Sequence, residues 1–271
     1  MSTQDMPHLA PYTVRERHHV GEHVWEIWIS TDEAILAALK PGMFVDVAVP
    51  GDPRHLVRIP LSYYDMDLHR SYLKLYVVNV GEGTKRFCHQ KVGSGATLIG
   101  PLGHGWELPK DTEHPALLVA GGSGAAPIYA AARMFAAGGI DCDVVMGAQS
   151  GTRFWHEGAA QLTTLDSSAD VQVFPATDDG SYGFHGFPTQ LMERLVEKKI
   201  YGSVLCCGPN SLMEGVAAIA AREHIPCQVS LERMMACGFG ACNTCSVAMK
   251  DGSVASCCQD GPVFDAEEVE W

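Results

Sequence analysis

The sequence predicts a multidomain protein that combines an N-terminal antiparallel β-barrel, a parallel α/β domain and a small C-terminal domain rich in cysteine. Three observations support this fold class. A chain of 271 residues is long for one core and fits two domains with a small appendage. The first hundred residues show short alternating strands, and from Ala116 strands alternate with helices. Half of the ten cysteines then fall between Cys237 and Cys258.

Segment 1–110 is predicted to form the barrel. Segments 23–30, 44–49 and 72–80 alternate in polarity or are rich in β-branched residues, as half-buried strands are. Pro-Gly and Gly-x-Gly turns punctuate this region, which favours a small barrel. Segment 32–40 is predicted to form one or two helical turns. The boundary to the next domain is expected within 108–115, where Pro, Lys and acidic residues replace apolar ones.

Segment 111–226 is predicted to form a Rossmann-like α/β domain. Strands are expected at 116–120, 143–147, 171–175 and 203–207, and helices at 127–137, 188–198 and 210–223. Strands that alternate with helices imply a parallel sheet. After Ile225 and Pro226 the pattern changes into the cysteine-rich segment 227–271.

Composition and charge exclude several classes of function. The chain is 46% hydrophobic, has a formal net charge of −13 and contains no local basic cluster. Such a charge repels nucleic acid and anionic lipid surfaces, so we expect neither as a partner. Residues 1–11 lack the pattern of a signal peptide, and no run of about eighteen apolar residues occurs, which predicts a cytoplasmic protein.

The cysteine cluster carries the strongest chemical signal. Cys237, Cys242 and Cys245 have the C-x4-C-x2-C spacing typical of plant-type [2Fe–2S] ligation, which needs a fourth cysteine further on. Cys257 and Cys258 compete for that position, and because neighbours on an extended chain point to opposite sides, only one is expected to reach the metal. The alternative is a four-cysteine zinc site, although zinc ribbons prefer paired C-x2-C knuckles and only one such pair occurs.

A glycine-rich turn predicts a nucleotide site. It follows a strand and opens a helix, the geometry that points amide donors and a helix dipole at a phosphate. Its candidate residues are Gly121, Gly122, Gly124 and Pro127, which takes the place of a third glycine. The alternative is a simple tight turn between strand and helix.

A second nucleotide segment ends a later strand. Cys207, Gly208 and Pro209 lie at the carboxyl end of segment 203–207, where ligands bind in open α/β sheets. The Cys207 thiol is a candidate contact for a nicotinamide ring, although buried cysteines commonly serve packing.

Two segments of the predicted barrel suit a flavin. Segment 58–62 offers a cation and a hydroxyl for a pyrophosphate, and segment 81–84 offers a glycine turn whose amides can approach it. Taken singly, each is better explained as a strand end or a turn. Beside a nucleotide turn and an iron–sulfur loop, they favour a flavin in the barrel.

These regions, in this order, resemble the ferredoxin-reductase-like family, and the similarity is closest to electron-transfer subunits of NAD-dependent dihydroorotate dehydrogenases. The segments that carry the resemblance are GPLGHG at 100–105, GGSGAAP at 121–127, TDDGS at 177–181, CGP at 207–209, MACGFGAC at 235–242 and CQDGPVF at 258–264. The resemblance implies FAD in the barrel, NAD in the α/β domain and a [2Fe–2S] cluster in the last segment. It also implies an FMN-containing barrel subunit that oxidises dihydroorotate as the partner, in a heterotetramer of two of each chain.

The resemblance also implies individual site residues. Cys258 takes the position of the fourth cluster ligand, and Asp178 joins the nucleotide site. The implied flavin residues are Arg58, Pro60, Leu61, Ser62, Tyr76, Val77, Val78, Gly83 and Thr84. One departure is that the family places its arginine three residues before the serine, where this chain has Ile59. A shift of one residue on a strand moves a side chain to the other face.

Hydride is expected to pass from the nicotinamide to the flavin, and single electrons from the flavin to the cluster. The cofactors carry this chemistry, so no catalytic acid or base is assigned. NADH is favoured over NADPH on the resemblance alone. The segment after the second α/β strand contains Arg153 but no carboxylate before Glu157.

Two other functions remain open. The Arg-Ile-Pro-Leu run at 58–61 is more similar to the small subunit of NADH-dependent ferredoxin:NADP oxidoreductases. The non-enzymatic alternative is a zinc-stapled nucleotide-binding module that regulates a partner. Met234, Met235 and Phe239 flank the first cluster ligands, either as local core or as an exposed apolar rim for docking.

Overall fold

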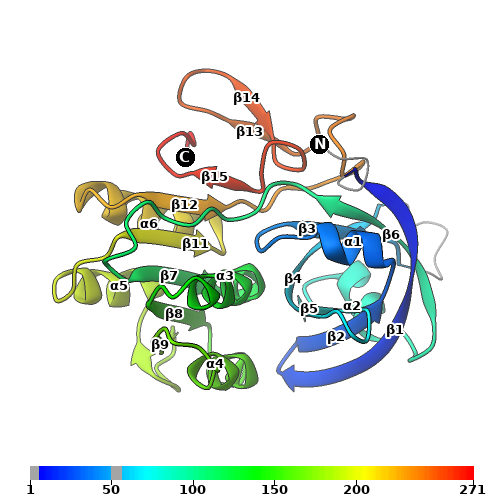
Figure 1. The fold of residues 1–271 in the computed structure, drawn as a ribbon, viewed down its shortest axis with the longest axis horizontal. Coiled ribbons are helices and arrows are strands. Elements are labelled where there is room, and N and C mark those ends of the chain that lie inside the picture. The colour runs from blue at the N-terminus through cyan, green and yellow to red at the C-terminus, as the bar shows by residue number, and fades with distance from the viewer. Residues whose placement is uncertain (1–5, 50–56) are drawn as a thin grey trace.

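A computed structural model describes residues 6–49 and 57–271 of the chain. The predicted fold class is confirmed: a closed barrel stands beside a mostly parallel sheet, and the cysteine-rich segment lies over the junction between them (Figure 1). Part of the N-terminal segment 1–11, namely residues 1–5, lies outside the described residues.

The barrel consists of six antiparallel strands in the order β1-β2-β5-β4-β3-β6. Alternate side chains of these strands fill its interior with Val, Ile and Leu, as the period of two requires. The strands are β1 (His8–Gly21), β2 (Val24–Ser30), β3 (Phe44–Val47), β4 (Ile59–Asp67), β5 (Tyr72–Val78) and β6 (Gly95–Leu102). Closure of the barrel leaves no exposed sheet edge.

Two short helices complete the barrel. Helix α1 (Glu33–Ala38) occupies the segment expected to be helical, and the Asp32 side chain caps it by accepting from the Ala34 amide at 2.8 Å. Helix α2 (Glu82–Cys88) was not predicted, because its glycines indicated a turn. Its apolar face, with Phe87 and Cys88, is buried, so tertiary packing outweighs the low helix propensity of glycine.

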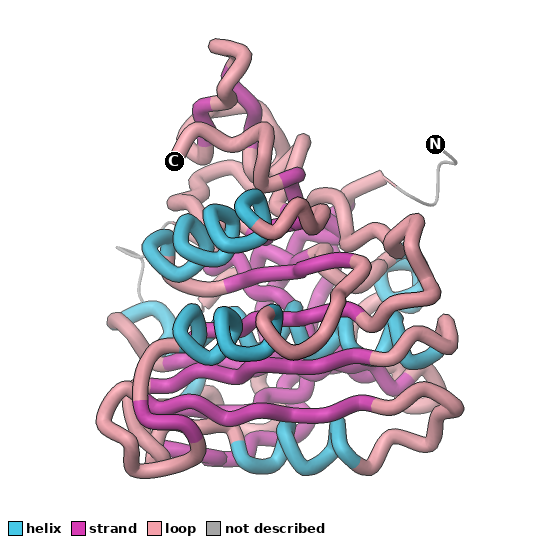
Figure 2. Tube along the Cα trace, turned by 90° about the vertical axis from the view of Figure 1, so that its left-hand side faces the viewer, coloured by secondary structure: helices cyan, strands magenta, loops and turns pink. Residues whose placement is uncertain are grey.

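The second sheet has seven strands in the order β10-β9-β8-β7-β11-β12-β15. The predicted strands are present as β7 (Ala116–Gly121), β8 (Cys142–Ala148), β9 (Val171–Thr177) and β11 (Ser203–Cys207), with β10 (Phe184–His185) at one edge. Helices α3 (Ala125–Ala137) and α4 (His156–Thr163) pack on one face, and α5 (Pro188–Val196) and α6 (Asn210–Arg222) pack on the other (Figure 2).

The C-terminal segment contributes to both neighbours. Strand β12 (Cys227–Ser230) pairs in parallel with β11, and β15 (Val263–Asp265) pairs antiparallel with β12, so the sheet extends beyond the boundary predicted at residue 226. Among the strands that the structure describes, only the hairpin of β13 (Ser246–Ala248) and β14 (Val254–Ser256) stands apart from the two larger sheets. The cysteine loop, residues 237–245, packs on the barrel, where a Cβ added to Gly238 would come within 2.9 Å of an Asp46 carboxylate oxygen.

A buried aromatic network joins the barrel to the α/β domain. Glu26 of β2, only 5% exposed, accepts hydrogen bonds from the Tyr64 hydroxyl and the Trp155 indole, each at 2.8 Å. The Trp155 ring packs 4.5 Å from Tyr76 and 5.2 Å from Tyr129 of α3, centroid to centroid. Because the buried carboxylate has two donors, this network fixes the two domains around the cavity described next.

Candidate functional site

A cavity of about 860 Å³ lies between the barrel and the carboxyl edge of the parallel sheet, a size typical of ligand sites. Its walls come from the tip of the β1–β2 hairpin, the end of β5, the turn after β7, the loop after β8 and the N-terminal ends of α5 and α6. The residues that line it include Glu22, His23, Tyr76, Val78, Gly121, Gly122, Ser123, Gln149, Arg153, Asp178, Pro209 and Glu232.

Two of the four predicted residues of the nucleotide turn line the cavity, and the other two pack inside the protein. Gly121 and Gly122 line the cavity, and Gly122 has φ of 56°, a conformation that favours glycine. Gly124 instead packs on β11, because a Cβ there would lie 2.1 Å from the Cys207 carbonyl oxygen. Pro127 is buried in α3, and its carbonyl accepts a hydrogen bond from the Trp106 indole at 3.0 Å.

The predicted segment 207–209 likewise has one residue that lines the cavity and two that do not. Pro209 lines the cavity, whereas Gly208 faces Gly121 and the Cys207 thiol is 2% exposed. Burial raises the pKa of the Cys207 thiol, which favours the neutral form. Among the described residues, Cys207 does not line the cavity, so its predicted nicotinamide contact would require a shift of the surrounding loop.

Glu232 is a cavity residue that no sequence motif predicts. It follows β12, and its carboxylate accepts a hydrogen bond from the Ser123 hydroxyl of the glycine turn at 3.0 Å. The two residues are 109 positions apart, so no spacing rule could join them. Asp178, which was predicted, lines the opposite part of the cavity, and burial raises the pKa of its carboxyl group.

The predicted flavin strand presents alternate residues to the cavity. Tyr76 and Val78 line it, whereas Val77 points into the barrel core and is 1% exposed. This follows from the period of two along a strand, so the Val77 side chain cannot face the same ligand as its neighbours. Only its backbone remains available.

The Arg58 guanidinium lies against β6 at the barrel wall. Its guanidinium donates to the Thr97 carbonyl at 2.8 Å and to the Thr97 hydroxyl at 2.9 Å. The charge also acts on Asp46, a carboxyl group 1% exposed, with one oxygen that has no hydrogen-bond partner among the described residues. Burial raises the pKa of Asp46 to about 6, and Arg58 opposes that shift.

Replacing Arg58 with alanine tests its predicted contact with the flavin pyrophosphate. We expect FAD affinity to fall by about tenfold or more, the scale of one lost charge-assisted hydrogen bond. Flavin content and titration of the apoprotein with FAD measure the effect. Arg15→Ala, an exposed arginine bonded to Ser30 on the same barrel, is the control. Unchanged FAD affinity would contradict the assignment and direct attention to Lys85 or Arg86.

The remaining flavin candidates lie near these groups. Leu61 and Ser62 pair with Val45 and Phe44 across the β3–β4 ladder, and Pro60 pairs with Asp46. The Thr84 hydroxyl accepts from the amides of Val80 and Gly81 at 3.0 and 3.1 Å, so it caps α2. Gly83 lies in the first turn of α2. Thr84 and Gly83 therefore form part of the turn that begins α2.

The cysteine loop brings its thiols together in two pairs. The Cys242 thiol contacts Cys237 and the Thr244 hydroxyl, and these contacts lower the pKa of the Cys242 thiol to about 6, Thr244 contributing most. The Cys245 sulfur lies 3.3 Å from that of Cys258. Within residues 6–49 and 57–271, no group of three or more His, Cys, Asp and Glu side chains is arranged to hold a single metal ion.

Backbone donors complete the fit to a two-iron cluster. The Ala241 amide donates to the Cys237 sulfur at 3.3 Å, and the Gly240 amide donates to the Cys258 sulfur at 3.2 Å. A [2Fe–2S] cluster places two thiolates on each iron and is stabilised by N–H···S bonds, so paired thiols with amide donors suit it.

Cys257 points away from these pairs. Its thiol is fully buried and donates to the Leu231 carbonyl at 3.1 Å. Burial raises the pKa of Cys257 and of Cys258 to about 12, so acidity does not separate the two. Orientation does, because Cys258 faces Cys245 and Cys257 faces the end of the sheet.

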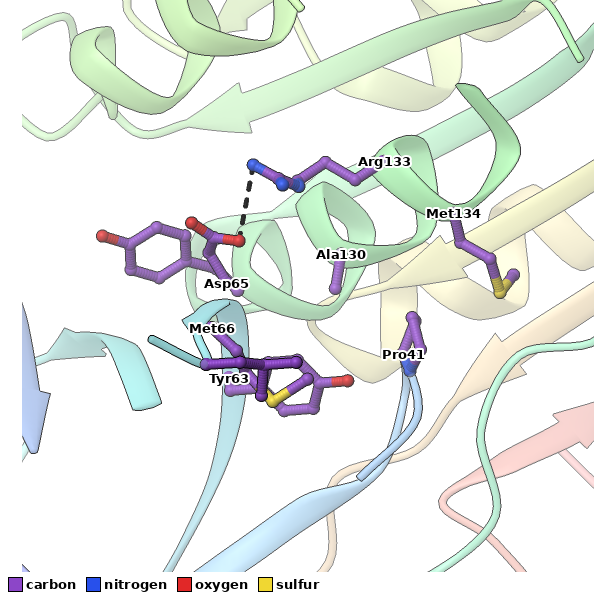
Figure 3. Close-up of a pocket in the computed structure, with 9 residues that line it drawn as sticks. Pro41, Tyr63, Asp65, Met66, Ala130, Arg133 and Met134 are labelled. Carbon is purple, nitrogen blue, oxygen red and sulfur yellow. Dashed lines mark ion pairs between the residues drawn. The ribbon is translucent and has the colours of Figure 1, made fainter. Parts of the chain in front are cut away.

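A smaller cavity of about 240 Å³ lies between β4 and α3. Arg133 of α3 and Asp65 of β4 form an ion pair of 3.4 Å on one side, with Met66, Met134 and Pro41 elsewhere around it (Figure 3). Among the residues that line this cavity there are no predicted cofactor contacts, so we assign it a structural part in holding α3 against the barrel.

Comparison with known proteins identifies the family. Residues 118–218 match the oxidoreductase NAD-binding domain, and residues 232–270 match the iron-sulfur cluster binding domain of dihydroorotate dehydrogenase B. A Desulforamulus reducens protein named dihydroorotate dehydrogenase B (NAD(+)), electron transfer subunit is 34% identical over 236 residues, which cover 85% of this chain and 87% of that protein. The chain belongs to this family of electron transfer subunits.

Other members and a solved relative agree with this placement in the dihydroorotate dehydrogenase B family. A Methanocaldococcus jannaschii protein named as a probable subunit of the same kind is 34% identical, over 86% of this chain and 81% of that protein. A structure of an NADH-dependent reduced ferredoxin-NADP oxidoreductase superposes with a TM-score of 0.84 at 27% identity, covering 96% of this chain and 89% of the other. None of the described helices is long and apolar enough to cross a bilayer.

Proposed function

We propose that this chain carries electrons between a nicotinamide nucleotide and a separate FMN-containing subunit that acts on dihydroorotate, through FAD and a [2Fe–2S] cluster. The observation that carries the proposal is the 34% identity, over most of the chain, to proteins named as electron transfer subunits of dihydroorotate dehydrogenase B. We further propose Cys237, Cys242, Cys245 and Cys258 as the cluster ligands. The two thiol pairs and their amide donors support this set.

The chain's own residues act by placement. When bound, FAD exchanges hydride with the nicotinamide and single electrons with the cluster. Tyr76 and Val78 give the flavin an apolar wall, and the Glu26 network holds that wall against the sheet. Gly121 and Gly122 bring backbone amides to the nucleotide phosphates. Oxidation of dihydroorotate to orotate releases two electrons, so with that substrate the net flow runs from the partner to NAD⁺, and with NADH it runs the other way.

The surface beside the cluster suits a partner. Met234 is 80% exposed and Phe239 is 54% exposed, whereas Met235 is buried. The predicted apolar rim is therefore formed by the first two side chains only. Exposed apolar groups next to a redox centre favour close docking of the partner, which shortens the electron path. We propose a heterotetramer of two chains of each kind.

Orotate formation tests the proposal. We expect the isolated chain to reduce artificial dyes with NADH but to form no orotate, because residues 6–49 and 57–271 offer one flavin site and no base placed to deprotonate dihydroorotate. Adding the proposed FMN-containing subunit should give orotate formation that depends on NAD⁺. Absorbance of orotate and of NADH measures both steps. The same mixture without NAD⁺ is the control, and orotate made by the isolated chain would refute the proposal.

A second candidate is the small subunit of an NADH-dependent ferredoxin:NADP oxidoreductase. The superposition with that enzyme and the Arg-Ile-Pro-Leu run at 58–61 favour it. It predicts electron exchange with reduced ferredoxin and no stable complex with an FMN subunit. A purified protein that is colourless and contains zinc would instead support the zinc-stapled nucleotide-binding module that regulates a partner.

A further inference from the structure

The tip of the β1–β2 hairpin reaches across the cavity to the loop that follows β8. The Glu22 amide donates to the Thr152 carbonyl at 2.8 Å, and the Glu22 carboxylate accepts from the Thr152 hydroxyl at 3.1 Å. The same carboxylate lies 3.6 Å from the Arg153 guanidinium and 3.7 Å from the His23 ring. Glu22, His23 and Arg153 all line the cavity.

In open α/β sheets of this kind, the loop after the second strand, here the loop after β8, contacts the ribose of the adenosine. In such sheets a carboxylate at this position favours NAD, and an arginine favours the 2′-phosphate of NADP. The loop has Arg153 and Gln149 but no carboxylate before Glu157, so its sequence taken alone predicts a phosphate site. Glu157 lies on α4 and is not among the residues that line the cavity.

The structure supplies the missing carboxylate from the barrel. Glu22 is 131 positions from Arg153 in the chain, yet it pairs with that arginine, whose guanidinium also donates to the Gln149 side chain. The Thr152 hydrogen bond and the Arg153 charge hold the pKa of Glu22 below its usual range, so the side chain is ionised at neutral pH. Arg153 is thereby committed to two protein partners.

We propose that Glu22 is a specificity-determining residue, which makes the cavity prefer NAD(H) to NADP(H). This inference rests on the proposed function only because it requires that a nicotinamide nucleotide binds in this cavity. A ribose 2′-hydroxyl can donate to the Glu22 carboxylate, whereas a 2′-phosphate brings about two negative charges beside it. Binding NADP would also require Arg153 to leave Glu22, which leaves one carboxylate without its partner.

Binding of NAD⁺ and NADP⁺ to the chain loaded with FAD tests this, because neither oxidised nucleotide reduces the flavin. Calorimetry should show wild-type protein binding NAD⁺ at least about tenfold more tightly than NADP⁺. Glu22→Gln keeps the size and the backbone contact of the side chain but removes its charge. It should narrow that ratio by about tenfold or more, mainly through tighter NADP⁺ binding.

Two further variants separate the charge effect from a loss of packing. Adding Arg153→Ala to Glu22→Gln should cancel the gain in NADP⁺ affinity, because the freed arginine is what would hold the phosphate. Glu157→Gln, which changes the first carboxylate after the loop, on α4, is the matched control and should leave the ratio unchanged. Equal binding of the two nucleotides by the wild type, or an unchanged ratio in Glu22→Gln, overturns the proposal. Normal FAD content and dye reduction in that case would leave the proposed function standing.

Discussion

Replacing Cys258 with alanine is expected to abolish iron binding, whereas replacing Cys257 leaves the iron in place. The Cys258 sulfur lies 3.3 Å from that of Cys245, where a shared iron would be held. The Cys257 thiol instead donates to the Leu231 carbonyl inside the protein. Iron and acid-labile sulfide per chain, with the visible absorption of the purified protein, measure the outcome.

Other cysteine variants serve as controls for this result. Alanine at Cys237, Cys242 or Cys245 should lose iron as Cys258→Ala does. Cys206→Ala, a buried cysteine in the middle of the sheet, should keep it. FAD content in every variant reports whether the barrel is still folded. Iron lost from Cys257→Ala but kept in Cys258→Ala would reverse the assignment. Zinc bound in place of iron would show that the four cysteines form a zinc site and not an iron–sulfur cluster.

Replacing Gly124 with alanine is expected to disrupt the nucleotide turn. An added Cβ would lie 2.1 Å from the Cys207 carbonyl oxygen and 2.8 Å from the Gly208 nitrogen, both backbone atoms that cannot turn aside. Overpacking of this kind typically costs about 1–3 kcal/mol. We expect a lower melting temperature and at least about tenfold weaker binding of NAD⁺, because β7 and β11 must separate where the phosphate amides lie.

Gly215→Ala is the matched control for this variant. It makes the same chemical change within the α/β domain, on helix α6, but the new Cβ meets only the movable Thr189 side chain, at 3.0 Å. Alanine also favours a helix over glycine by about 1 kcal/mol. Its melting temperature and NAD⁺ affinity should therefore stay near the wild-type values. A Gly124→Ala protein as stable as this control would show that the turn is looser than the structure indicates.

The sequence by itself determined the fold class, the order of the three regions and the chemistry expected in each. These features are local: the spacing of Cys237, Cys242 and Cys245, a glycine turn between a strand and a helix, and the alternation of strands with helices. Local patterns reflect the period of an element or the reach of a short loop, which neighbouring residues define. The family resemblance rested on the same short segments, and comparison over most of the chain confirmed it.

Side-chain direction was decided only by the folded chain. Tyr76 and Val78 face the cavity while Val77 faces the barrel core, although all three are predicted flavin contacts. Segment 81–84 begins helix α2 because Phe87 and Cys88 find a buried surface there. Strands β12 and β15 join the sheet from beyond the predicted domain boundary, through ladders whose partners are distant in sequence.

Charged residues of the cavity were also placed only by the tertiary structure. Glu22 meets Arg153, and Glu232 meets Ser123, across more than a hundred residues in each case. Neither contact can be predicted from periodicity or spacing. The partners come within reach only when the barrel, the sheet and the C-terminal segment pack together. The kinds of cofactor could therefore be predicted from local motifs. The residues that discriminate between nucleotides depend on contacts between domains, which the packing of the whole chain creates.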